Sequence, residues 1–79
     1  MMKPSKALKI IGKDDPVLEC CDFGDFYGFV FGIDGEPKGS GYTCVDKSTG
    51  RVFPFNPFDD FDLFGKGKQV PLTEVENGR

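Results

Sequence analysis

The stretch from Phe26 to Ile33 constrains the fold more than any other part of the sequence. It reads Phe-Tyr-Gly-Phe-Val-Phe-Gly-Ile and is the longest apolar run in the chain. At the two-residue period of a β-strand, Tyr27, Phe29 and Phe31 share one face, and two glycines fall on the other. Large rings on one side predict a strand that turns this face toward the core. The glycines allow a bulge or a closely packed helix on the opposite side.

Two antiparallel hairpins are expected. The first joins residues 17–21 to residues 26–33 across a turn-rich segment. The second joins residues 42–46 to residues 51–55, and Gly50 is placed for a positive φ at the end of the intervening turn. Pro54 cannot donate to a sheet ladder, so the last of these strands is expected at an edge of the sheet, or to end there.

A short helix is expected on each side of the hairpins. Ser5 is suited to begin the first helix and Gly12 to end it. Asn56 is suited to cap the second helix, which then runs to Gly65. A short extended piece follows at residues 70–72, and residues 73–79 are expected to be a frayed tail.

This order of elements predicts a single small α+β domain over residues 1–79. Its core is a four-stranded antiparallel sheet, made of two hairpins and flanked by the N-terminal and C-terminal helices. Because a one-sided sheet must bury its apolar face, both helices are expected on the same face.

Composition argues against several classes of function. The chain has no histidine, the side chain best suited to proton transfer near neutral pH. Cys20, Cys21 and Cys44 offer at most two thiolates at a workable spacing for zinc, because adjacent residues of a strand point to opposite faces. We therefore expect no enzyme activity, no metal and no cofactor, with reduced cysteines that fill space.

Charge and hydropathy limit the expected partners and the expected cellular compartment. The net charge is −3, and no run of Lys or Arg is long enough to follow a phosphate backbone, so nucleic acid is not expected as a partner. No apolar stretch approaches the length of a membrane span and no signal-peptide pattern begins the chain, so a cytoplasmic protein without a membrane partner is expected.

A partner-binding surface is the candidate site. Nine Phe and two Tyr are more rings than a domain of this size can hide, so some are expected to be exposed. The Phe stripe 58/61/64 at helical spacing fits a core face, with a partner anchor as the alternative. The nearby carboxylates fit helix capping, or the steering of a basic partner. The candidate residues are Phe55, Phe58, Asp59, Asp60 and Asp62.

One segment resembles a known family. Residues 41–52 read Gly-Tyr-Thr-Cys-Val-Asp-Lys-Ser-Thr-Gly-Arg-Val, which resembles the Y-x-V-D-K-x-T-G-x-V hairpin of small bacterial immunity proteins of the YrhB-like type. A similar hairpin occurs in PepSY-type propeptide modules. Residues 55–64 look like the ending of short uncharacterised proteins carried by phages and other mobile elements. The resemblance covers residues 41–72, and the chain lacks the longer N-terminal helix of the immunity family.

The resemblance implies a protein that neutralises a toxin or a defence enzyme by occupying it. The leading hypothesis is therefore a non-enzymatic inhibitor or immunity-type protein. One alternative is a phage-encoded antagonist of a host defence complex. Another is a small-ligand or nucleotide-binding module that closes the glycine loop of residues 34–41 over its ligand. A homodimer through edge strand 51–55 is a further possibility.

Overall fold

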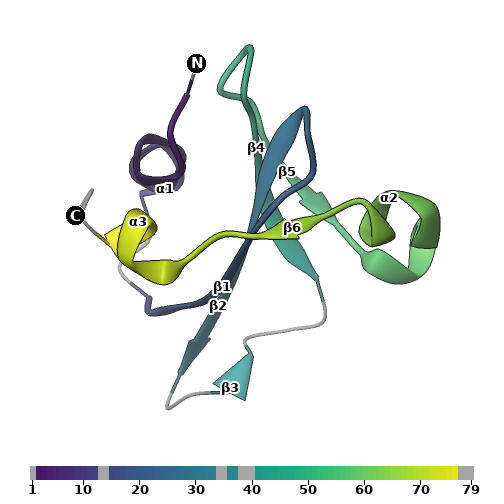
Figure 1. Ribbon diagram of the computed structural model, residues 1–79. Helices are drawn as coiled ribbons and strands as arrows, with labels where there is room; N and C mark the ends of the chain where they lie inside the picture. The colour runs from purple at the N-terminus through teal and green to yellow at the C-terminus, as the bar shows by residue number, and fades with distance from the viewer. Residues whose placement is uncertain (1, 13–14, 34–35, 38–40, 77–79) are drawn as a thin grey trace.

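The computed structural model describes residues 2–12, 15–33, 36–37 and 41–76 (Figure 1). In chain order the elements are α1 (Pro4–Ile11), β1 (Val17–Asp22), β2 (Phe26–Ile33), β3 (Glu36–Pro37), β4 (Tyr42–Asp46), β5 (Val52–Phe55), the 3-10 helix η1 (Pro57–Asp59), α2 (Phe61–Gly65), β6 (Lys68–Gln69) and α3 (Leu72–Glu76). The chain is an α+β fold, as the sequence predicts. Within the described residues, no helix has the length and apolar character that crossing a membrane requires.

The sheet contains both expected hairpins and is wider than expected. Its strand order is β5-β4-β2-β1-β6, and every neighbouring pair is antiparallel. The two-residue strand β6 pairs with the end of β1, and β3 pairs with the end of β2. The prediction of four strands was therefore too low, because two-residue strands carry no hydrophobic period that a sequence pattern can detect. The β1–β2 register shifts between Val17 and Glu19, so the bulge lies in β1.

Helix α1 ends as predicted but begins earlier. Gly12 adopts φ +73° and its N–H donates to the carbonyl oxygen of Leu8, which is a left-handed C-terminal cap. Lys3, and not Ser5, is the N-terminal capping residue, and Pro4 occupies the first helical position. Proline is favoured there because its fixed φ suits the helix and its missing N–H has no partner to lose.

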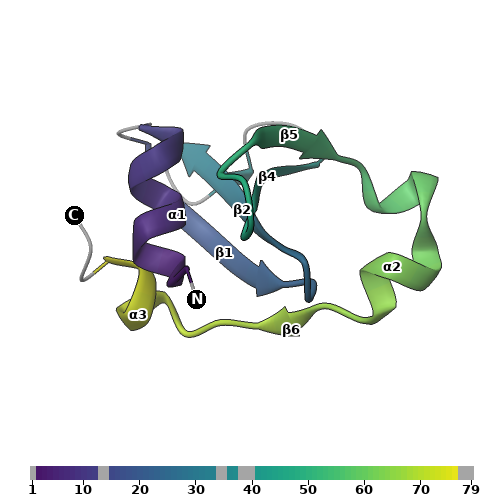
Figure 2. The same cartoon turned by 90° about the horizontal axis from the view of Figure 1, so that it is seen from above.

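The C-terminal segment is ordered further than expected. Residues 73–76, predicted to belong to a frayed tail, lie within α3, where Val75 is completely buried. Helix α3 packs against α1 and β1 (Figure 2), and the N–H of Val70 donates to the carbonyl oxygen of Cys20 at 2.8 Å. Residues 77–79 lie outside the described part. The sequence gives little sign of α3, because only Leu72 and Val75 are apolar in this helix.

The expected helix from Asn56 to Gly65 is interrupted. Asn56 Oδ1 accepts a hydrogen bond from the N–H of Phe58 at 3.0 Å, and thus caps η1 as predicted. Asp60 then leaves the helical region, with φ −153° and ψ 86°. Its Oδ1 accepts from the N–H of Leu63 at 3.0 Å, so Asp60 begins a second, separate helix.

The sheet has a hydrophobic cluster on each face. The helix-side cluster lies between the sheet and α1 and α3, and its buried members are Ala7, Leu8, Val17, Cys20, Tyr27, Phe29, Phe31, Val45, Val70 and Val75. This confirms that the face of β2 with Tyr27, Phe29 and Phe31 turns toward the core. The opposite face carries the aromatic cluster, made of Cys21, Phe23, Tyr42 and Cys44 with the half-buried Phe26, Val30, Phe53 and Phe55.

Both helices had been expected on one face of the sheet, but the structure places helices on different sides. Helices α1 and α3 cover the helix-side cluster. The ring of Phe64 in α2 instead lies 6.3 Å, between centroids, from the ring of Tyr42 in the aromatic cluster. In Figures 1 and 2, α2 stands at the end of the molecule opposite α1 and α3.

Candidate functional site

Residues 56–67, which we call the arm, connect one edge of the sheet to the other. The arm leaves β5, passes through η1 and α2, and returns to the sheet at β6 (Figure 2). Apart from their contact with each other, η1 and α2 make no extensive contact with any helix or strand in the described part of the chain. The arm therefore projects from the fold and is held mainly at its base.

The base of the arm is fixed by one ring. Phe23 is 6% exposed, and its ring lies against two glycines. A Cβ placed on Gly28 of β2 would come within 2.7 Å of Phe23 Cε2, and one on Gly67 within 2.6 Å of Cε1. The ring thus occupies space that a side chain at either position would need. The glycine face of β2 receives an aromatic ring, where a bulge or a closely packed helix had been expected.

The tip of the arm exposes two Phe side chains. Phe58 is 71% exposed and Phe61 is 64% exposed, and their rings meet edge to face with centroids 5.9 Å apart. Phe64, nearer the base, is 41% exposed. The interpretation of the 58/61/64 stripe as core is therefore wrong. Exposed rings gathered on one projecting element are typical of an interaction surface, because water contact with them is unfavourable.

Carboxylates surround these rings. Asp59 and Asp62 are exposed, and neither carboxylate makes a hydrogen bond or an ion pair within the described residues. Asp60 is also exposed, but its carboxylate caps α2. Residues 52–65 contain three Asp and no Lys or Arg. The tip therefore combines apolar surface with uncompensated negative charge.

The predicted site residues divide into two groups. Phe58, Asp59 and Asp62 lie together at the tip, and Asp60 lies between them in a capping role. Phe55 lies apart from them in the aromatic cluster, with ring centroids 5.4 Å from Phe23 and 6.2 Å from Tyr42.

Sequence reasoning did not place Phe61 in the site. Its spacing from Phe58 and Phe64 had been assigned to a buried helical face. The residues Phe-Asp-Asp-Phe-Asp over 58–62 fit an amphipathic helix equally well, so the sequence contains no signal for the exposure of Phe61.

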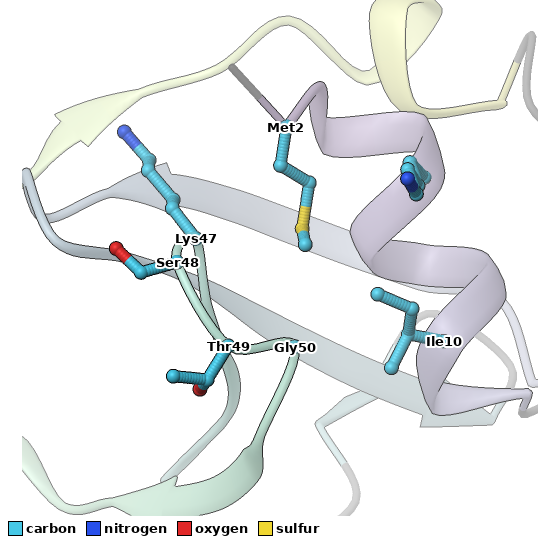
Figure 3. Close-up of a pocket in the computed structure, with 7 residues that line it drawn as sticks. Met2, Ile10, Lys47, Ser48, Thr49 and Gly50 are labelled. Atoms are coloured by element: carbon cyan, nitrogen blue, oxygen red, sulfur yellow. The ribbon is translucent and has the colours of Figure 1, made fainter.

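A groove lies between α1 and the β4–β5 turn at the other end of the molecule (Figure 3). It is open to solvent, has a volume of about 520 Å³, and is lined by Met2, Lys6, Ile10, Lys47, Ser48, Thr49 and Gly50. The side chains of Met2 and Ile10 point into it, whereas those of Lys47, Ser48 and Thr49 point away. The groove therefore combines two apolar side chains with a polar lining that includes Lys6, Ser48 and Thr49.

The ammonium group of Lys47 is held away from the groove by its own contacts. Its Nζ lies 2.7 Å from Asp22 Oδ1 and 4.5 Å from the centroid of the Tyr27 ring, and its side chain is only 13% exposed. Burial of Asp22 acts to raise the pKa of this carboxyl. The hydrogen bonds from Lys47 and from the N–H of Gly24 outweigh that effect, and the net pKa is lowered. The charge of Lys47 is thus already compensated.

The β4–β5 turn has the predicted chemistry. Asp46 Oδ1 accepts hydrogen bonds from the N–H groups of Ser48 and Thr49 at 2.8 and 3.0 Å, and these bonds lower the pKa of Asp46. Gly50 has φ +75°, which confirms the positive φ expected there.

The three cysteines are buried free thiols. Cys20 belongs to the helix-side cluster and Cys21 to the aromatic cluster, as expected for neighbours in a strand. Burial raises the pKa of Cys20 and of Cys44 to about 12, and it also raises that of Cys21. Thiols with raised pKa values stay protonated at neutral pH, and a protonated thiol is a poor nucleophile.

A disulfide between Cys21 and Cys44 is excluded by the register. Both residues pair with Gly28, from the two sides of β2. Their Cα atoms are therefore two strand spacings apart, roughly 9–10 Å, whereas a disulfide needs less than about 7 Å. Within the described residues, no three Cys, Asp or Glu side chains are grouped to hold a metal ion.

The glycine loop of residues 34–41 lies mostly outside the described residues. Of this segment the structure describes strand β3 at residues 36–37 and Gly41. The hypothesis that it closes over a small ligand stays a prediction.

Comparison of the chain with protein-family models, with curated proteins and with solved structures finds no match.

Proposed function

We propose that this chain is a non-enzymatic binding protein that recognises another protein through the tip of the arm. The observation that carries the proposal is the exposed, edge-to-face pair of Phe58 and Phe61 with the uncompensated Asp59 and Asp62 beside it. The partner would present an apolar pocket for the two rings, surrounded by Lys or Arg side chains.

The two kinds of side chain have different roles in this proposal. Buried aromatic anchors at an interface supply most of the binding free energy, often about 2 kcal/mol or more for each ring. Exposed charges act mainly on the rate of association, because they steer a partner of opposite charge. Phe58 and Phe61 therefore determine how long the complex lasts, and Asp59 and Asp62 how fast it forms.

The consequence for the partner is inhibition. A domain without an assigned catalytic group acts on another protein by occupying its surface, which is also what the resemblance to immunity-type proteins implies. A phage-encoded antagonist of a defence complex would use the same surface, so the two differ in partner and not in mechanism. We place the protein in the cytoplasm because buried unpaired thiols suit a reducing compartment.

The test compares tip variants with matched controls. Phe58→Ala/Phe61→Ala removes the anchors, and Val52→Ala, which truncates an apolar side chain that is 45% exposed outside the arm, is the control. A partner captured from cell extract by the parent and by the Val52 variant, but not by the tip variant, identifies the specific complex. Circular dichroism should show the same folded state for all three proteins.

The charges are tested on the purified complex. Asp59→Asn/Asp62→Asn should slow association and flatten its dependence on salt, while dissociation changes little. Asp25→Asn is the control, because Asp25 is exposed and lies outside the arm. Capture that survives loss of both tip rings would contradict the proposed function. A partner that proves to be a nucleic acid bound through Lys66 and Lys68 would also contradict it.

A further inference from the structure

The two ends of the molecule carry opposite charge. At one end Lys3, Lys6 and Lys9 lie exposed on or beside α1, and residues 2–12 contain no Asp or Glu. At the other end, residues 52–65 contain three Asp and no Lys or Arg. Acidic groups also occur near this end: Glu74 borders Lys3, Asp15 follows the end of α1, and the carboxylate of Asp46 is engaged by the turn.

The groove at the basic end has the features that the arm tip requires. Met2 and Ile10 point into it, and Ile10 is 38% exposed (Figure 3). Lys6 lies between them on the same helical face, is exposed, and makes no ion pair within the described residues. A volume of about 520 Å³ is within the range of pockets that hold small organic groups, so an aromatic side chain can enter.

We propose that the groove between α1 and the β4–β5 turn receives the arm tip of a second copy of this chain. Phe58 or Phe61 would enter between Met2 and Ile10, and Asp59 or Asp62 would meet Lys6. This inference rests on the proposed function, because it takes the arm tip as the docking element and names a second copy as a partner for it.

Such contact is head to tail. Because the arm and the groove are different surfaces at opposite ends of the molecule, each bound pair keeps one free arm and one free groove. Association therefore continues beyond the dimer as concentration rises, unless a ring closes. The arm tip would be covered in the assembled form, so a tighter partner would have to compete with the second copy.

Edge pairing through β5 is a different route to a dimer, and the backbone disfavours it. The N–H of Asp46 donates to the carbonyl oxygen of Arg51 at 2.9 Å, and hydrogen-bonded pairs alternate along an antiparallel ladder. Val52 and Pro54 therefore direct their backbone groups away from β4. Since Pro54 has no N–H, that edge lacks one of its donors.

A complementation experiment tests the head-to-tail contact. The arm variant is Phe58→Ala/Phe61→Ala and the groove variant is Lys6→Glu, all at exposed positions. In sedimentation velocity between about 10 μM and 1 mM, the parent should gain mass with concentration and each variant should stay monomeric. An equimolar mixture should form a 1:1 dimer and nothing larger, because the arm variant supplies an intact groove and the groove variant an intact arm.

Lys9→Glu is the matched control, since it makes the same charge change on α1 outside the groove and should associate like the parent. Lys6→Glu should weaken association by more than about tenfold. A monomeric parent at 1 mM, or a mixture that stays monomeric, overturns the inference. If the arm variant still loses an external partner in that case, the proposed function stands. Self-association that survives in the arm variant would instead point to strand pairing.

Discussion

Phe23 shows how strongly a single ring can constrain two glycines. Alanine at Gly28 would place its Cβ 2.7 Å from Phe23 Cε2 and 3.2 Å from Tyr42 Cδ1, and the Phe23 ring is also confined by Gly67. Overpacking of this kind costs about 1–3 kcal/mol. We expect Gly28→Ala to lower the free energy of unfolding by that amount in denaturant titration.

Gly65→Ala is the control for this prediction. A Cβ on Gly65 would have no neighbour within 4 Å, and Gly65 lies at the end of α2, where alanine is the better helix former. Its stability should stay within about 0.5 kcal/mol of the parent. Equal stabilities for the two alanine variants would show that the Phe23 ring can move aside.

The buried thiols make stability sensitive to alkaline pH. The pKa of Cys20 and that of Cys44 rise from an ordinary 9.0 to about 12 on folding. Above pH 9 the unfolded chain therefore binds fewer protons than the folded one, and the free energy of unfolding falls as pH rises. Each thiol contributes a slope of up to about 1.4 kcal/mol per pH unit.

The measurement is a series of urea titrations from pH 7 to pH 10.5. Below pH 8 these thiols should not change the free energy of unfolding with pH. Above pH 9 the free energy of unfolding should fall. Cys44→Ala removes one titrating group, so its stability should decline less steeply than that of the parent. An unchanged slope would mean that the Cys44 thiol ionises as readily in the folded protein as in the unfolded one.

At the scale of single residues, the sequence predicts those features that depend only on local backbone conformation. Gly12 and Gly50 were both expected at turns or helix ends, and both have positive φ. The contacts of Gly28 and Gly67 with one ring were not predictable, because they depend on segments far apart in the sequence that the fold brings together. The exposure of Phe61 was missed for the same reason.

Among the elements, the β4–β5 hairpin gives the clearest test of turn chemistry. Gly50 has φ +75°, where an L-residue with a branched Cβ is strained. We expect Gly50→Val to cost about 1–2 kcal/mol, visible as a lower melting temperature. Ser48→Val introduces the same side chain two residues earlier in the turn, at an exposed position, and should cost less.

Elements with their own turn or cap signals were predicted well, and the others were not. Both long hairpins and α1 follow from turn residues, apolar alternation and a C-terminal glycine. Strand β6 and helix α3 have two and five residues, too few for a periodic pattern, and they form because the sheet and α1 offer surfaces to pack on. The break at Asp60 was also missed, because Asp suits both a helical first turn and a cap.

For the whole molecule, the arm should be its least stable part. Helices η1 and α2 have no buried residue, whereas β4 contains the fully buried Cys44 and Val45. Local opening requires little loss of buried surface, so the amides of residues 61–66 should exchange with solvent faster than those of β2 and β4. Hydrogen exchange followed by NMR gives this comparison directly. Protection of α2 equal to that of β4 would show that the arm opens only when the whole protein unfolds.

The arm joins the two edges of the sheet, and this arrangement affects which residues can change during evolution without loss of the fold. Both ends of the arm are set by strands that pair independently of the residues between them. Lengthening a loop whose ends are already placed costs little, roughly 0.6 kcal/mol for each doubling. Mutation within residues 57–65 can therefore change the exposed side chains of the arm while the sheet is retained. Under the function proposed above, related chains would come to bind different partners long before they differ in fold.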